Sequence, residues 1–198
     1  MPTMIHIPPQ APVSRAGSAY RLGRSAIRGL LYCAALVPVA VAALPAGLLG
    51  RGRSVAGWWG ALRARLLGRP DVEPAGRPGP VAVVNHAVLS LLLGAAALVP
   101  LGATLLTVAR GALYGFVEPG PFDDAWGGPT LAGAWLAHFL IGIPFALAGL
   151  AALAGIAAIH QRLTLALHGA RRAPWLIPAT VVVALFGALV IFAWSRQL

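Results

Sequence analysis

Four long apolar runs alternate with polar connectors along the chain. The runs contain no Asp, Glu or Arg and cover residues 29–50, 81–109, 131–159 and 176–194. A bilayer core of about 30 Å takes roughly 20 apolar residues in a helix, and each run is close to that length or longer. Their Ala, Leu, Val and Gly composition favours helices over the alternating segments of a membrane barrel. The pattern predicts an all-α bundle of about four transmembrane helices.

Two further segments lie outside the apolar runs, one before the first run and one between the first two. Residues 1–20 are rich in Pro, Ser and Ala and predict a disordered tail, which leaves residues 21–198 as one helical domain. Residues 53–69 carry an apolar stripe that includes Trp58 and Trp59 and is flanked by Arg63. We expect an amphipathic helix that lies in the membrane interface, with its arginines at lipid phosphates. The alternative is a helical extension of the first run that packs on the other helices.

The amino-acid composition also indicates a membrane protein, and it limits the kinds of partner to expect. The chain of 198 residues is 59% hydrophobic and 10% charged, whereas soluble domains carry about 25% charged residues. A formal net charge of +10 could suit a nucleic-acid binder. The arginines lie between apolar runs, however, so we assign them to membrane topology and anionic lipids and expect no nucleic acid. The single cysteine, Cys33, excludes an internal disulfide.

The arginines also predict an orientation. They are concentrated in loops 51–80 and 160–175, whereas loop 110–130 carries Glu118, Asp123 and Asp124 among few basic residues. The positive-inside rule then places the two basic loops in the cytoplasm and loop 110–130 outside the plasma membrane. The N-terminal arginines also prefer the cytoplasm, so the first run is either a complete span or a re-entrant hairpin broken at its prolines. Both alternatives stay open.

The outer loop, residues 111–130, has the most individual sequence of the chain. Its Pro and Gly residues favour tight turns that lead into the third long helix, with Pro129 in the first turn of that helix. We expect residues 122–130 to pack on the outer helix ends and to bury the side chains of Phe122 and Trp126 there. The loop is either a rigid lid or a ligand or partner site, whose candidate residues are Asp123, Asp124, Trp126, Gly127, Gly128 and Pro129.

Four polar residues lie at membrane depth: Asn85, His86, Ser90 and His138. Such residues are either functional or bond neighbouring helices. His86 and Ser90 share a helical face with Gly94, and we expect His86 at the inner end and His138 at the outer end, too far apart to meet. The histidines at 160 and 168 fall in a basic connector at a spacing that predicts no metal pair.

Sequence motifs of common catalytic and cofactor sites are missing from the chain. It has no phosphate-binding glycine loop with a following Lys, no HExxH, no CxxC and no GxSxG. We therefore predict no enzyme activity, no cofactor and no metal. The carboxylates lie outside the apolar runs, which disfavours proton pumps and cation transporters.

The segment DDAWGGPTLAGAW, from Asp123 to Trp135, carries a family resemblance together with its flanking helices. It is similar to the sensor domain of actinobacterial membrane proteins, which often precedes a histidine kinase. The resemblance implies a non-catalytic, sensor-like membrane module in the lipid bilayer. Its partner would be a histidine kinase, a response regulator, another membrane subunit or a second copy of the chain. The family's kinase module is missing here, and the alternative function is a small transporter or permease subunit.

Overall fold

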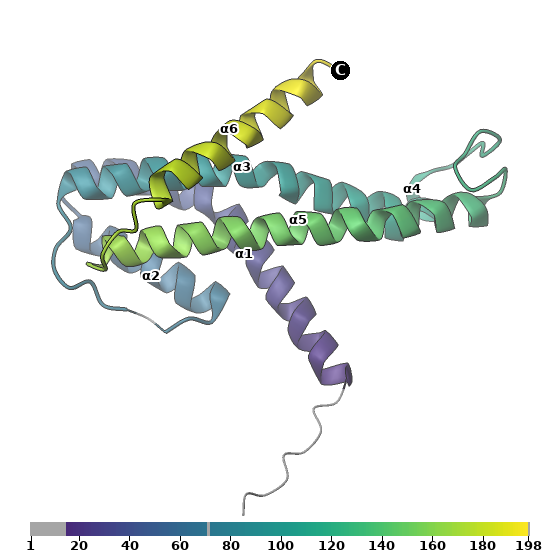
Figure 1. Cartoon of the computed structure of the whole chain (residues 1–198). Coiled ribbons are helices and arrows are strands. Elements are labelled where there is room, and N and C mark those ends of the chain that lie inside the picture. Colours follow the sequence, from purple (N-terminus) through teal and green to yellow (C-terminus); the bar gives the residue numbers. More distant parts are fainter. Residues whose placement is uncertain (1–14, 71, 198) are drawn as a thin grey trace, which may run out of the picture.

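The computed structural model describes residues 15–70 and 72–197, and over these residues it is built from α-helices without a strand. The helices are α1 (Arg15–Leu48), α2 (Gly52–Leu67), α3 (Pro80–Ala112), α4 (Tyr114–Val117), α5 (Leu131–Leu167) and α6 (Leu176–Ser195) (Figure 1). Four of them are long and apolar enough to cross a membrane: Tyr20–Leu48 within α1, and all of α3, α5 and α6. The predicted all-α membrane bundle is confirmed.

The first apolar run lies in one continuous helix. α1 passes through Pro38 and Pro45 without a break, and its apolar part of 29 residues is about 44 Å long at 1.5 Å per residue. The run is therefore long enough for a complete span, and it is not a hairpin. Residues 15–20, expected in a disordered tail, belong to α1, whereas residues 1–14 of that expected tail lie outside the described residues.

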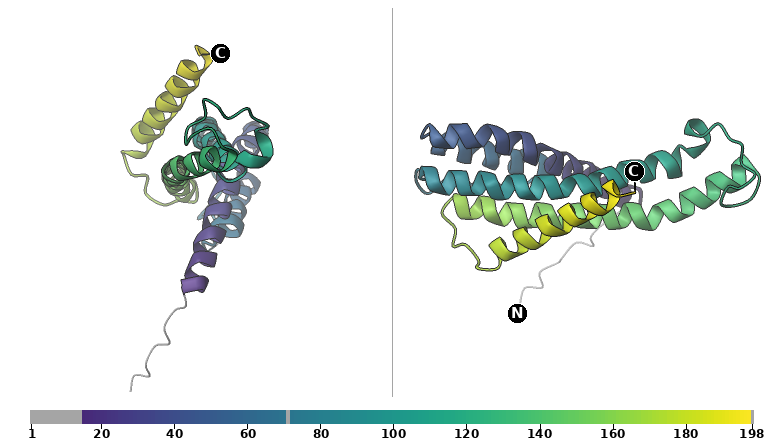
Figure 2. Two further views of the ribbon diagram at one scale, coloured as in Figure 1. Left: turned by 90° about the vertical axis from the view of Figure 1, so that its right-hand side faces the viewer. Right: turned by 90° about the horizontal axis from the view of Figure 1, so that it is seen from above.

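α3 and α5 form the antiparallel axis of the molecule. With 33 and 37 residues, they are about 50 and 55 Å long. α1 and α6 pack on α3 along part of this axis, and the first half of α1 and the end of α6 then diverge from it in opposite directions (Figure 2). We call the end where residues 47–55, 75–83 and 160–176 meet the basic end. The other, formed by residues 110–131, is the loop end.

Local sequence signals explain where the helices begin and end. Pro80 occupies the first position of α3, where its missing N–H costs nothing. Gly68 ends α2 in the left-handed conformation, with φ 62°. Thr130 caps α5, because its hydroxyl accepts a hydrogen bond from the Gly133 N–H at 3.1 Å. The expected placement of Pro129 in the first helical turn was wrong: α5 begins two residues later, at Leu131.

α2 is the helix expected near residues 53–69, and its inner face packs on the bundle. This face buries Val55, Ala56, Trp59, Gly60 and Arg63. Arg63 is only 7% exposed, so it is not in the expected position at lipid phosphates, and the packing follows the alternative proposed for this helix. The connector after α2 returns to the basic end, where the Ala75 N–H donates to the His168 carbonyl at 3.0 Å.

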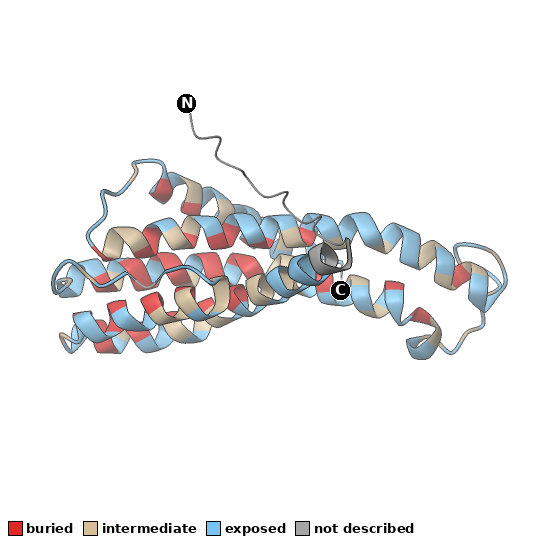
Figure 3. Cartoon of the chain, turned by 90° about the horizontal axis from the view of Figure 1, so that it is seen from below, coloured by how far each residue is buried: buried red, intermediate tan, exposed pale blue. Residues whose placement is uncertain are grey.

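Burial is concentrated toward the basic end, as Figure 3 shows. There α1, α2, α3 and α5 share one core. Gly94 allows α1 and α3 to approach closely, because a Cβ atom at Gly94 would lie 3.0 Å from the backbone nitrogen of Val37. The predicted helical face of His86, Ser90 and Gly94 therefore points into the bundle.

Candidate functional site

A cluster of buried polar side chains lies where α1, α2, α3 and α5 meet near the basic end. We call it the polar cluster; it comprises Tyr32, Trp59, Arg63, His86, Ser90, His160, Thr164 and His168. Each of these residues is at most 7% exposed. Buried polar groups require partners, so the hydrogen bonds of this cluster decide what it can do.

His160 is the centre of a hydrogen-bond chain that joins three helices. The Ser90 hydroxyl donates to the His86 carbonyl at 2.7 Å, so its oxygen is left to accept from Nε2–H of His160, 2.9 Å away. His160 Nδ1 then accepts from the Tyr32 hydroxyl at 2.7 Å. These roles assign the His160 proton to Nε2, because Ser90 has only one proton to donate. The chain ties α1 and α3 to α5.

Trp59 brings α2 into contact with the same two histidines. Its ring centroid lies 5.3 Å from that of His86, edge to face, and 4.9 Å from that of His160. The two imidazole centroids are 5.3 Å apart. Such aromatic contacts each contribute about 0.5–1.5 kcal/mol beyond area burial. Trp59 of α2 thus contacts the two histidines by ring packing, whereas α1 and α3 are joined to His160 by hydrogen bonds.

Several polar atoms of the cluster have no hydrogen-bond partner in the part of the chain that the structure describes. They are Trp59 Nε1, Arg63 Nε and Nη1, both ring nitrogens of His86, and Nδ1 of His168. By contrast, His168 Nε2 donates to the Ala56 carbonyl at 3.0 Å. Each unpaired buried group costs about 1–3 kcal/mol relative to a paired one. Trp59 and Arg63 offer only donors, so the cluster has an excess of N–H groups and suits an acceptor such as an anion.

His86 connects the polar cluster to a pocket at the N-terminus of α3. We call this the α3 pocket; it has a volume of about 520 Å³ and is lined by Gly79, Val81, Ala82, Asn85, His86, Leu163, Ala166, Leu167 and Arg172. Arg172 lines the same pocket as His86. The pocket therefore combines an apolar wall with a basic mouth, and its buried polar group is an unpaired histidine.

Only part of this site was predicted from the sequence pattern. That pattern selected Asn85, His86 and Ser90, and the structure places the first two at the α3 pocket and the last two in the polar cluster. The pattern placed His160 and His168 in a basic connector, whereas both are buried because α5 continues to Leu167. The available signal was spacing: polar residues at positions 160, 164 and 168 recur every four residues and share one helical face.

His138 lies apart from the cluster, at the loop end, as expected. Its ring stacks on Tyr114 with centroids 4.1 Å apart. Its Nδ1–H donates to the Ala134 carbonyl at 2.8 Å, one turn earlier in α5. His138 also lines a shallow pocket of about 390 Å³ together with Arg110, Tyr114, Asp124, Ala125 and Trp126. This pocket brings basic, acidic and aromatic side chains together, whereas the residues of the polar cluster include no carboxylate.

The outer loop packs on the helices only in part. Phe122 is half-buried, with its ring centroid 6.3 Å from that of Tyr114. The backbone of Gly127, at φ 100°, touches that of Gly133 so closely that a Cβ atom would collide with the carbonyl. Trp126 is 69% exposed, so its expected burial was wrong. Asp123, Asp124 and Pro129 are also exposed, and Gly128 has open space around its α-carbon.

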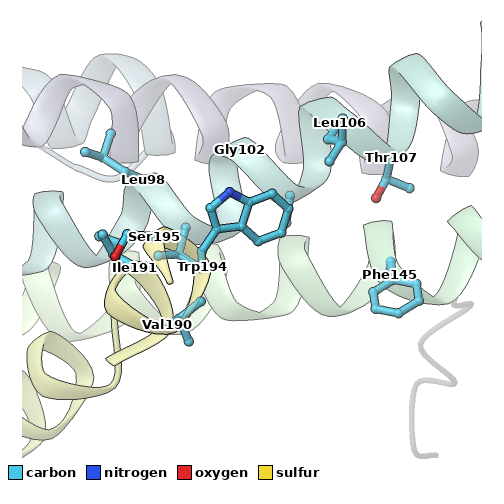
Figure 4. Close-up of a pocket in the computed structure, with 11 residues that line it drawn as sticks. Leu98, Gly102, Leu106, Thr107, Phe145, Val190, Ile191, Trp194 and Ser195 are labelled. Atoms are coloured by element: carbon cyan, nitrogen blue, oxygen red, sulfur yellow. The ribbon is translucent and has the colours of Figure 1, made fainter. Parts of the chain in front are cut away.

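A third hollow lies between α3, α5 and α6 and is apolar. It has a volume of about 790 Å³ and separates the diverging end of α6 from α3. Figure 4 shows the Trp194 indole within it, near Gly102 of α3, with Phe145 of α5 on its far wall. Such a surface among membrane-spanning helices suits lipid chains, and it offers little polar chemistry to a specific ligand.

Metal ligands do not gather in any part of the chain that the structure describes: no three His, Cys, Asp or Glu residues are placed to share an ion there. The fold and its four spans make the chain a multi-pass helical membrane protein. Comparisons with protein-family models, with curated proteins and with solved structures gave no match.

Proposed function

We propose that the chain is a non-catalytic, sensor-like membrane module that passes a signal to a separate cytoplasmic protein. One observation carries the proposal: the polar cluster joins α1, α2, α3 and α5, yet six of its polar atoms have no hydrogen-bond partner within residues 15–70 and 72–197. A packing with unpaired groups is poorly stabilised relative to alternatives, so a ligand or partner that pairs them would shift the population of helix packings. The resemblance of residues 123–135 to a sensor family agrees with this role.

α2 is the element most suited to move. It contacts His86 and His160 through the Trp59 ring, carries the unpaired Arg63 donors, and is tied to the cluster by the hydrogen bond of its Ala56 carbonyl with His168. By contrast, α1 and α3 are held by hydrogen bonds to His160 at the centre of the cluster. Its outer face presents exposed residues, including Arg65, next to the basic connectors. We propose that a change in the packing of α2 is what a histidine kinase, a response regulator or another membrane subunit detects.

Distance measurements test this proposal. Spin labels at Arg65→Cys in α2 and Val88→Cys in α3, in a Cys33→Ala background, report the packing of α2; both sites are exposed. A control pair, Leu105→Cys and Leu140→Cys, reports α3 against α5 near the loop end. We expect two distances for the first pair, in a ratio that changes between neutral and anionic lipid, and one distance for the control. A single unchanging distance for the first pair would refute the proposal, and opposite changes at the two ends would favour the transporter alternative.

The proposed orientation places loops 51–80 and 160–175 in the cytoplasm and loop 110–130 outside the plasma membrane. Its support is the arginine asymmetry across α3 and α5. Labelling with an impermeant thiol reagent in intact cells tests it, with cysteines at Arg65, Arg171 and Asp124, all of which are exposed. We expect labelling at 124 only. Labelling at 65 and 171 but not at 124 would reverse the orientation.

A further inference from the structure

We propose that the α3 pocket binds a phosphate group, supplied by an anionic lipid or by a soluble phosphate compound. The pocket lies where the N-terminus of α3, the end of α5 and the connector before α6 meet. Three kinds of hydrogen-bond donor converge on it: backbone N–H groups, an unpaired histidine and a guanidinium group. The binding does not depend on the proposed sensor function, whereas its role as the input signal does.

The backbone supplies the first donors. The first backbone hydrogen bond of α3 runs from the Val83 N–H to the Gly79 carbonyl at 3.1 Å. The N–H groups of Val81 and Ala82 therefore have no partner within the helix, and both residues line the pocket. No acidic residue lies in the first turn of α3 to occupy this position. The partial positive charge of a helix N-terminus and its free N–H groups favour phosphate.

His86 gives independent evidence for a ligand. His86 lines the pocket and is 1% exposed, yet neither of its ring nitrogens has a hydrogen-bond partner among the described residues. Burial of an unpaired imidazole is unfavourable, because the hydrogen bonds that it made to water are lost. A phosphate oxygen in the pocket would accept a hydrogen bond from the His86 ring N–H. This contact would also reach the polar cluster, because the His86 ring touches Trp59 of α2.

Arg172 and Asn85 complete the polar side of the pocket. Both are exposed, and Arg172 makes no ion pair with any residue that the structure describes. A planar guanidinium binds two phosphate oxygens at once, and the Asn85 amide offers two more donors. Among the residues that the structure describes, no carboxylate lines the pocket. The remaining wall is apolar, including Leu163 and Leu167, and it continues onto the membrane-spanning helices, so a lipid that carries a phosphate also fits.

Binding to the full-length chain in detergent tests the inference. The probes are inorganic phosphate, at matched ionic strength against chloride, and short-chain phosphatidic acid against the diacylglycerol with the same chains. The readout is the midpoint of thermal unfolding as a function of probe concentration, because a ligand that binds the folded state raises it. Stabilisation by both phosphate probes indicates a soluble ligand, and stabilisation by phosphatidic acid alone indicates a lipid. No response, or an equal response to diacylglycerol, overturns the proposal.

A matched pair of variants locates the site. Arg172→Gln should weaken binding of the active probe by about tenfold or more, because it removes a charged, two-fold hydrogen bond. Arg171→Gln removes the same charge from an exposed neighbour that does not line the pocket, and it should leave the affinity within about twofold. Asn85→Leu, also exposed, should weaken binding without unfolding the chain. Equal losses in the two arginine variants would show diffuse attraction to a basic surface and refute the site. If phosphate binds but the distance between the spin labels on α2 and α3 does not change, the binding site is supported and the sensor role is refuted.

Discussion

The two ends of the α3–α5 pair are built in opposite ways. At the basic end, α1 and α2 cover the pair and bury a tryptophan, an arginine and three histidines. At the loop end, the pair extends beyond α1 and α2, and two of its large aromatic side chains are mostly exposed, Phe116 at 81% and Trp126 at 69%. The basic end therefore resembles the interior of a soluble domain, whereas the loop end is a two-helix arm whose helices are joined by the outer loop.

This difference shows that a distinctive sequence and a buried site are separate properties. The loop end has the most individual sequence, yet its acidic residues face outward and few polar groups there are buried. At the basic end the connectors look like ordinary arginine-rich loops, but they enclose polar groups that lack partners. Energetic consequences of substitution should follow burial, so the same change at the two ends should have unequal effects.

The largest expected difference concerns two tryptophans. Trp59→Ala should reduce the free energy of unfolding by about 3–5 kcal/mol, because it leaves a large cavity between α2 and the two histidines. Trp126→Ala should change it by about 0.5 kcal/mol or less, because the side chain is mostly exposed. Unfolding by sodium dodecyl sulfate, followed by tryptophan fluorescence, measures both. Similar losses for the two variants would show that the loop end is as well packed as the basic end.

Helix positions were largely predictable from the sequence because hydrophobic length decides them. The runs at 81–109 and 176–194 match α3 and α6 closely. The run at 131–159 gave the start of α5 and missed its last eight residues, since Gln161 and Arg162 end an apolar run without ending a helix. Helix ends depend on caps and neighbours, and these are set by tertiary contacts that hydropathy does not report.

A smaller difference is expected between two histidines. His160→Phe keeps an aromatic ring and removes the hydrogen bonds to Tyr32 and Ser90; it should cost about 1–3 kcal/mol, because the Tyr32 hydroxyl is left buried without a partner. His138→Phe should cost about 0.5 kcal/mol or less, since it retains the stack on Tyr114 and loses one bond to a carbonyl of its own helix. The same detergent titration compares them.

A double-mutant cycle provides the control for this comparison. Tyr32→Phe removes the same hydrogen bond from the other side, so its cost should be lower in the His160→Phe background than in the original chain. Fully additive costs would mean that the bond between Tyr32 and His160 contributes nothing to stability. The hydrogen-bond chain would then be a consequence of packing and not one of its causes.

The candidate site was less predictable than the fold, and the reason is pairing across helices. Hydropathy identified His86 and Ser90 because polar residues stand out in an apolar run. It could not identify Trp59 and Arg63, since an amphipathic helix has the same sequence pattern whether its partner is a membrane surface or three other helices. Only the fold shows that α2 turns back along α1 and places Trp59 on two histidines.

The smallest expected effect on stability belongs to two variants that test whether the signal enters at the basic end or at the loop end. Asp123→Asn and Asp124→Asn remove equal charge from adjacent, exposed positions, so each should change the free energy of unfolding by about 0.5 kcal/mol or less. Only Asp124 lines the shallow pocket with Arg110 and His138, which makes Asp123→Asn its control. If the signal enters at the basic end, both variants should keep the lipid-dependent change in the α2–α3 distance. If it enters at the loop end, Asp124→Asn should abolish that change while Asp123→Asn retains it. That result would contradict the α3 pocket as the input, and it would require a signal that travels along the whole α3–α5 pair to reach α2.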